Sequence, residues 1–260
     1  MILVHFVIRL SNIRHLDLSH NTLSGRCIPF LANMTSLRVL DLSGIQLNSL
    51  VPVMPNLLEL DLSANKFEHW EDVGIWRRCH LKQLKVSSNW LRMEWTDSSM
   101  NISEYSDCAL EWLDLSSSFS KGTFPKPLER MANLRGLLLS HNKLTGSIPE
   151  SLGRLGSLQV VDLSHNMLTG PVPESLGRLI SLQVVDLSYN KLTVPIPTFL
   201  GKLTKLDLSG NHLNGSIPET FGRLEALNTS IARKTFFITN TSHVFKLLNW
   251  NHSRFNWATC

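Results

Sequence analysis

The sequence predicts an α/β solenoid, in which short repeats stack into one elongated domain, and three observations support this. A 24-residue pattern occurs twice in succession within residues 134–178, as LRGLLLSHNKLTGSIPESLGRLGS and then LQVVDLSHNMLTGPVPESLGR. Leucine returns at a similar spacing along most of the chain. Within each pattern, apolar and polar residues alternate as in a short strand. A fixed period of this length is typical of solenoids, whose repeats bury their leucines against their neighbours.

One repeat shows how the residue types produce this coil. Counting its first leucine, Leu158, as position 1, Val161 at position 4 and the leucine at position 6 form the buried side of a strand. Asn166 at position 9 carries an amide that can bond the backbone where the chain leaves the strand. Gly170 and Pro173 then break any helix and force a turn. Two further leucines bring the chain back to the next strand.

The chain divides into three parts, and the middle part contains nine repeats. Residues 1–12 form the edge of the first coil, residues 13–227 the solenoid, and residues 228–260 a tail without leucine period that we expect to be poorly ordered. The repeats begin at Ile13, Leu37, Leu57, Leu81, Leu110, Leu134, Leu158, Leu182 and Leu203, and a tenth start at Leu227 is truncated.

Two columns recur in seven of the nine repeats, Asp at position 5 and Asn at position 9. Lys85 and Leu138 replace the Asp. Ile45 and Ser118 replace the Asn, and we expect the stack to be less well tied at those two repeats. The column of Asp could suggest cation binding, but one carboxylate per coil more simply gives an acidic stripe that nearby Ser and Lys side chains solvate or pair.

Residues 65–112 are irregular and rich in tryptophan, and the repeat that begins at Leu81 carries five extra residues. The Trp side chains there either fill a wider core or contact a partner, since insertions in repeats often map to a binding face. Trp112 is an exception, because position 3 of a repeat faces outward.

The net charge of +4 is scattered and includes no basic block of the kind that binds nucleic acid, although acidic partners such as pectic wall sugars are compatible with it. Cys79 and Cys108 each lie two residues before a repeat start, so they form a candidate disulfide, and two separate buried thiols are an equal alternative. Six glycosylation sequons favour a secreted glycoprotein. These candidate sites are Asn33, Asn101, Asn214, Asn228, Asn240 and Asn251.

The pattern LxxLxLxxNxLxGxIPxxLxxL resembles the plant-specific leucine-rich repeat over about residues 13–227, and its most specific residues are Leu144, Gly146, Ile148, Pro149, Leu168, Gly170, Val172, Pro173, Leu213, Gly215, Ile217 and Pro218. This resemblance implies a leucine-rich-repeat right-handed solenoid with parallel strands on its concave face. The chain looks like part of the ectodomain of a plant receptor-like protein, and it resembles the xylanase-elicitor-receptor type with its irregular repeats.

Such proteins are cell-surface glycoproteins that sense ligands along the inner curve and signal in defence or development through partner receptor kinases. The resemblance therefore implies a location at the extracellular face of the plasma membrane or in the secreted fraction. The chain departs from the family in lacking a convincing signal peptide, a paired-cysteine cap and a transmembrane helix.

Nothing in the pattern brings catalytic groups to one point, so we expect no enzyme activity, cofactor or metal. His141 and His165 lie one repeat apart and could bind a metal or sense pH, but two solvated imidazoles explain them more simply. Ser140 beside His141 follows from the repeat consensus rather than from nucleophilic catalysis.

Function is therefore expected of a surface that binds a protein or peptide ligand, with a co-receptor kinase as a second partner and no nucleic acid. The candidate contacts on the concave face are His15, Asp17, His20, Glu59, Asp61, Gln83, Lys85, Trp112, Asp114, His141, Asp162, His165, Asp186, Tyr189, Lys205 and Asp207. A secreted inhibitor similar to the polygalacturonase inhibitors is one alternative, and a truncated gene product without independent function is another.

Overall fold

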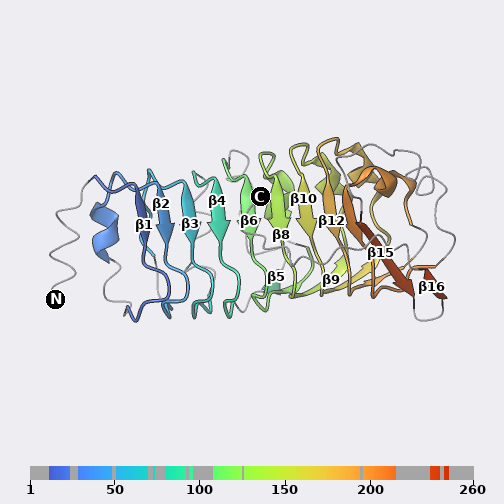
Figure 1. Ribbon diagram of the computed structural model, residues 1–260, viewed down its shortest axis with the longest axis horizontal. Helices are drawn as coiled ribbons and strands as arrows, with labels where there is room; N and C mark the ends of the chain where they lie inside the picture. The colour runs from blue at the N-terminus through green and yellow to red at the C-terminus, as the bar shows by residue number, and fades with distance from the viewer. Residues whose placement is uncertain are drawn as a thin grey trace.

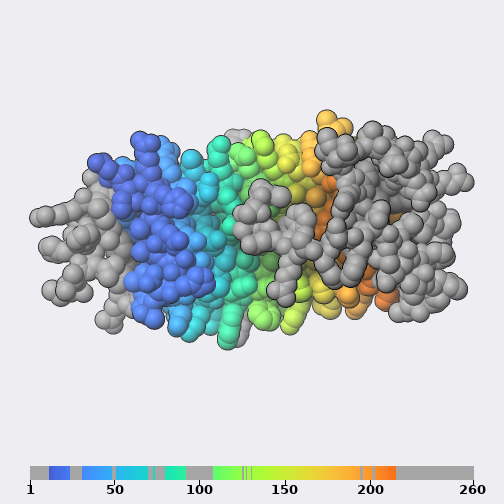
Figure 2. All heavy atoms as spheres, viewed as in Figure 1, coloured from blue at the N-terminus to red at the C-terminus, as the bar shows by residue number. Residues whose placement is uncertain are grey.

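The computed structural model describes residues 12–23, 29–48, 51–69, 73, 80–91, 94–95, 108–124, 126–193, 196–214, 235–240 and 243–245. Its strands stand side by side along the long axis (Figure 1). The space-filling view shows the same elongated body, with the colours in chain order from one end to the other (Figure 2). The predicted solenoid is confirmed.

The main sheet contains one three-residue strand from each of the nine repeats, and these strands are all parallel. They are β1 (His15–Asp17), β2 (Val39–Asp41), β3 (Glu59–Asp61), β4 (Gln83–Lys85), β6 (Trp112–Asp114), β8 (Gly136–Leu138), β10 (Val160–Asp162), β12 (Val184–Asp186) and β14 (Lys205–Asp207). Equal repeat positions face each other, so Val161 pairs with Leu137 on one side and with Val185 on the other. Repeats of unequal length therefore align the same repeat positions across the sheet.

Two further strands come from the part of the chain where the leucine period stops. β15 (Thr235–Asn240) pairs parallel with β14, and β16 (His243–Phe245) pairs antiparallel with β15. Thr235 faces Lys205, so the sheet continues through a strand that the leucine pattern does not mark. The domain boundary at residue 227 stays a prediction.

The core is one continuous cluster of the leucines and valines at the inward positions of every repeat. Leu137, Val161 and Val185 are fully buried, as are the leucines that return the chain after each turn, such as Leu152 and Leu176. Burying one such side chain contributes roughly 1.5–3 kcal/mol before entropy is subtracted. Because each side chain touches the neighbouring rungs, this energy is distributed along the coil.

A ladder of buried asparagines ties each rung to the one before it. Asn166 donates from Nδ2 to the backbone oxygens of Leu139 (2.9 Å) and Leu163 (3.1 Å), and its Oδ1 accepts the Leu144 N–H at 3.0 Å. The same three bonds recur at the other buried position-9 asparagines, Asn65, Asn89, Asn142, Asn190 and Asn211. The predicted backbone role of this residue is confirmed.

The two repeats without Asn solve the same turn differently. The residue after the missing Asn has positive φ in both, 62° at Gln46 and 53° at Phe119. The Asn of the following repeat then accepts an additional bond, from the N–H of Ile45 to Asn65 at 3.2 Å and from Ser118 to Asn142 at 3.1 Å. Part of the tie missing from one rung is thus supplied by the next.

A second sheet lies after the turn and contains β5 (Glu94–Trp95), β7 (Lys121–Gly122), β9 (Lys143–Ser147), β11 (Met167–Gly170) and β13 (Lys191–Leu192), all parallel. The sequence predicts only a turn at Gly170. That glycine ends β11 with φ 76° and pairs with Leu192. The chain then returns through short 3-10 helices, η2 (Pro29–Asn33), η5 (Lys126–Arg130), η6 (Glu150–Arg154), η7 (Glu174–Arg178) and η8 (Thr198–Lys202).

Two features of the irregular middle are resolved. Trp90 is 57% exposed and does not fill the core. Cys108 is buried and disulfide-bonded. Cys79, its proposed partner, lies outside the described residues together with Trp70 and Trp76, so the pairing stays a prediction.

Candidate functional site

The candidate site is the open face of the main sheet. It is formed by the side chains at positions 3 and 5 of each repeat, which lie on the strand, together with position 8 at the following turn. Position 4 between them points into the core, so alternation along the strand turns positions 3 and 5 outward. Nine strands at the usual strand spacing make this face roughly 40 Å long. The predicted contacts at its two ends, around His15 and around Lys205, therefore cannot meet in one small pocket.

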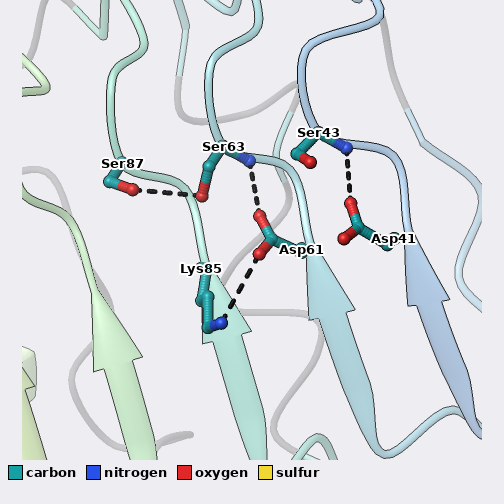
Figure 3. Close-up of polar contacts among 6 residues, drawn as sticks. All are labelled: Asp41, Ser43, Asp61, Ser63, Lys85 and Ser87. Carbon is teal, nitrogen blue, oxygen red and sulfur yellow. Dashed lines mark hydrogen bonds and ion pairs between the residues drawn. The ribbon is translucent and has the colours of Figure 1, made fainter. Parts of the chain in front are cut away.

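The seven position-5 aspartates have a structural role that the sequence did not reveal. In each, Oδ1 accepts the backbone N–H two residues later, at 2.8–3.0 Å. Figure 3 shows this bond at Asp41 and Asp61. The aspartate thus fixes the turn after the strand. The only signal in the sequence is the serine that follows two residues after the aspartate.

Ser and Lys side chains pair with this row as expected at several rungs. The hydroxyls of Ser164 and Ser188 donate to Asp162 and Asp186 at 2.7 Å. Lys85 occupies position 5 itself and reaches back to Asp61, with Nζ 3.6 Å from Oδ2 (Figure 3). These carboxylates therefore accept both neutral hydroxyl donors and an ammonium group.

An apolar zone interrupts the acidic row at the sixth repeat, where Leu138 replaces Asp. Position 3 of the same repeat is Gly136, and the ring of Trp112 from the preceding strand lies against it. A Cβ atom at Gly136 would stand 2.3 Å from Cε3 of Trp112, so any other residue there would displace the ring. Trp112 is half-buried on the open face, and Val160 extends the zone to the next strand. The sequence does contain a signal for Gly136. Positions 3 and 5 of its repeat both depart from the consensus, and the preceding repeat has a Trp at position 3.

Burial and neighbouring charges along the row shift the pKa of two carboxyl groups and one imidazole. Burial raises the pKa of Asp162, and the carboxylate of Asp186 raises it further against hydrogen bonds from Ser164. Burial and Asp186 likewise raise the pKa of Asp207. The pKa of His165 is lowered, first by burial and then by repulsion from His141. At the exposed end of the row, hydrogen bonds from Ser19 lower the pKa of Asp17.

Position 8 has positive φ in every one of the nine repeats, from 51° at His165 to 66° at Gly210. This shared conformation brings the side chains of successive rungs face to face. His141 stacks on His165 with ring centroids 4.1 Å apart, and His165 stacks on Tyr189 at 4.3 Å. The three predicted contact residues are therefore adjacent, as an aromatic stack at the edge of the open face.

The arrangement shows little that resembles a catalytic or metal centre. The Ser140 hydroxyl donates to the Ser116 hydroxyl at 3.1 Å rather than to an imidazole. Within the part of the chain that the structure describes, no group of three or more His, Cys, Asp or Glu side chains is placed to hold a metal. The open face offers a long line of binding groups instead.

The candidate glycosylation sites are only partly visible. Asn33 and Asn214 are exposed. Asn240 is the last residue of β15. Asn101, Asn228 and Asn251 lie outside the described residues, and glycosylation at all six stays a prediction. No helix among the described residues is both long and apolar enough to cross a bilayer.

Two family models match the chain. The model described as "Leucine rich repeat" matches residues 108–168, and a second "Leucine Rich Repeat" model matches residues 12–34, 181–203 and 202–224. These matches cover regular repeats on both sides of the irregular middle.

Curated relatives come from Arabidopsis thaliana. Receptor-like protein 15 is 42% identical over 90 residues, which cover 33% of this chain and 9% of the relative. Receptor-like protein 13 is 34% identical over 147 residues, which cover 54% of this chain and 13% of the relative. The chain thus matches about a tenth of the length of these relatives.

Two solved structures show the same coil at 31% identity. The Arabidopsis receptor kinase HAESA, in complex with the peptide hormone IDA and the co-receptor SERK1, matches 82% of this chain and 37% of its own, with a TM-score of 0.71. The leucine-rich-repeat ectodomain of the Arabidopsis receptor kinase GASSHO1/SCHENGEN3, in complex with CASPARIAN STRIP INTEGRITY FACTOR 2, matches 89% and 31%, with a TM-score of 0.68. The chain therefore folds as a leucine-rich-repeat solenoid that is similar to the ectodomains of these plant receptors.

Proposed function

We propose that this chain recognises a peptide or protein ligand on the open face of its main sheet, as the extracellular ligand-binding region of a plant receptor-like protein in defence or developmental signalling. The observation that carries the proposal is the apolar zone of Trp112, Gly136 and Leu138 in the middle of a long acidic row. An aromatic ring held flat against a glycine is a preformed, rigid anchor for one apolar ligand side chain.

The charge around this zone favours a ligand with basic groups. Asp114 precedes Leu138 in the row and Asp162 follows it. Each uses Oδ1 for its own turn, and a carboxylate has a second oxygen that can accept from a ligand donor. The pair of Lys85 and Asp61 is an internal example of such a contact.

A binding role without catalysis fits a surface of repeated, widely spaced groups better than chemistry does. The complexes named for HAESA and GASSHO1/SCHENGEN3 support a peptide ligand, and the SERK1 complex of HAESA supports a co-receptor kinase as the second partner. The same relatives and the sequons support an extracellular location.

The test is a binding screen of the full chain against synthetic plant signalling peptides, by fluorescence anisotropy. We expect at least one peptide to bind, and Trp112→Ala to weaken it by about tenfold or more, because a buried aromatic anchor contributes about 2 kcal/mol. Gly136→Ala should act in the same direction by displacing the ring. Ile180→Ala, at a 91% exposed residue away from the strands, is the control.

Two results contradict the proposal. One is a folded chain that binds no peptide of the screen, and the other is a bound peptide that is indifferent to both Trp112→Ala and Gly136→Ala. Inhibition of fungal pectinases by the chain would instead favour the inhibitor alternative.

A further inference from the structure

A second surface runs along the solenoid beside the open face and has no part in the proposed ligand recognition. It is the row of side chains at position 10 of the nine repeats, here called the rim row. All of its members are exposed: Thr22, Gln46, Lys66, Trp90, Phe119, Lys143, Met167, Lys191 and His212. Three of its members are held by a bond from their backbone N–H to the position-11 carbonyl of the preceding repeat, at 2.7 Å for Lys66, 3.0 Å for Trp90 and 2.8 Å for Lys143.

Large apolar side chains gather at the centre of the rim row. Trp90 and Phe119 belong to consecutive repeats and are 57% and 55% exposed, and Met167 is 37% exposed. They stay outside because position 11 fills the core, where Phe67 and Leu91 are fully buried. Adjacent exposed aromatic residues on an otherwise well-packed coil mark an interaction site.

The charge of the rim row has one sign. Lys66 precedes Trp90 in the row, Lys143 follows Phe119, and Lys191 follows Met167, whereas none of the nine members is acidic. A partner of complementary charge therefore carries carboxylates on both sides of an apolar group. From Lys66 to Lys191 the row crosses five strand spacings, or roughly 24 Å, which an extended segment of about seven residues can follow.

A lysine over one of the aromatic rings favours a polypeptide over an acidic polysaccharide. Sugars pack on the free faces of aromatic rings. The ammonium of Lys143 lies 5.8 Å from the centroid of the Phe119 ring and occupies one such face. Trp, Phe and Met are also the side chains enriched in contacts between proteins.

We propose that the rim row from Lys66 to Lys191 is a docking surface for a second polypeptide, which contributes an extended acidic segment with at least one large apolar side chain. The apolar side chain packs on Trp90 and Phe119, and the flanking carboxylates pair with Lys66 and Lys143. This site is separate from the open face and can be occupied together with it.

The experiment measures binding of a labelled, capped peptide with two Glu-Leu-Glu triplets in a Ser-Gly background to the full 260-residue chain. An analogue with Gln-Leu-Gln triplets is the charge control, and polygalacturonate is the competing acidic sugar. We expect the Glu peptide to bind at least about fivefold more tightly than the Gln analogue, with the difference shrinking as salt is added. Circular dichroism confirms that every variant is folded.

Matched variants locate the site. Trp90→Ala combined with Phe119→Ala should weaken the peptide by about tenfold or more, whereas Ile180→Ala should leave it unchanged. Lys143→Glu should weaken it by about fivefold or more, whereas Arg154→Glu, at an exposed residue of η6, should not.

Three outcomes overturn the proposal: no binding up to about 1 mM peptide, equal binding of the Gln analogue, or binding of polygalacturonate alone. A loss caused by Trp112→Ala but not by the Trp90 and Phe119 pair also overturns it, because the peptide would then occupy the open face. That result leaves the proposed ligand recognition standing, so the two proposals fail separately.

Discussion

The repeats with a buried Asn and the two repeats without one make the same turn by different means. At Asn166 one amide joins the rung to the backbone of the preceding rung, and position 10 keeps an ordinary backbone. At Ser118 the hydroxyl keeps one bond to the preceding rung, at 3.2 Å to the Val86 oxygen, and Phe119 moves into the left-handed region. Asn142 of the next rung then accepts two N–H groups. The difference teaches that a solenoid repairs a missing contact through its neighbour, so the importance of an Asn depends on the repeat before it.

The largest expected loss of stability comes from a substitution that removes this compensation. Asn142→Ala leaves the N–H groups of Ser118 and Ser120 and the Leu115 oxygen without their amide partner. Because unsatisfied buried groups cost about 1–3 kcal/mol each, we expect a loss of about 4 kcal/mol in the free energy of unfolding. Asn166→Ala, in a regular repeat, should lose about 1 kcal/mol less, as measured by urea denaturation. Equal losses in the two variants would contradict a shared role of Asn142.

A cavity in a regular rung gives the next effect. Leu163 is fully buried, and Leu163→Ala should lower the free energy of unfolding by about 3 kcal/mol, since truncating a core leucine costs about 2–5 kcal/mol. The loss should be local, because each rung packs only on its neighbours. Hydrogen exchange should accelerate near β10 before it does near β2, and uniform acceleration would argue against independent rungs.

Substitution of position 10 by glycine compares the backbone conformation of the two kinds of repeat. Gln46 has φ 62°, so Gln46→Gly should raise the free energy of unfolding by about 1 kcal/mol by removing left-handed strain. Lys66 occupies the same position in a repeat with a buried Asn, and Lys66→Gly should lower the free energy of unfolding by about 0.5–1 kcal/mol through chain entropy. Thermal denaturation of both variants gives the signs, and effects of the same sign would show that position 10 does not differ between the two kinds of repeat.

The smallest expected effect concerns pH and compares the middle of the acidic row with its end. The pKa of Asp162 is raised in the folded chain, so the folded state holds the proton more tightly, and this group adds stability as pH falls from 7 towards its ordinary value. Asp162→Asn should therefore raise the Tm at pH 7 by about 1–2 °C and remove that gain at low pH. Asp17 has a lowered pKa, so Asp17→Asn should act in the opposite direction at pH 7. A fall in Tm at pH 7 for Asp162→Asn would contradict the assigned burial.

The sequence predicted most of the fold because one side-chain period encodes it. Val161 and Asn166 each appear at fixed positions in nearly every repeat, and their burial follows from the alternation of a strand. The second sheet was missed because β11 contains Thr169 and Gly170, which have the composition of a turn. The strand there is imposed by pairing with β9 and β13 rather than by local propensity.

The candidate site was predicted as a set of rows but not as a set of contacts. That His141 and His165 are neighbours follows from the period, whereas their stacking depends on the positive φ at position 8, which a non-glycine residue does not announce. The exposure of Trp90 could not be predicted, because its repeat is irregular and a Trp residue is more often buried in the core. Such features arise between rungs, and a pattern within one rung does not contain them.

Amide hydrogen exchange at Ser118 and Ser120 in the Asn142→Ala variant tests most directly whether the following repeat compensates for a missing Asn. We expect both amides to exchange at least about tenfold faster than in the unaltered chain, while the Leu168 amide, bound to Asn190, keeps its rate. Unchanged exchange at Ser118 and Ser120, or equal acceleration at Leu168, would contradict it.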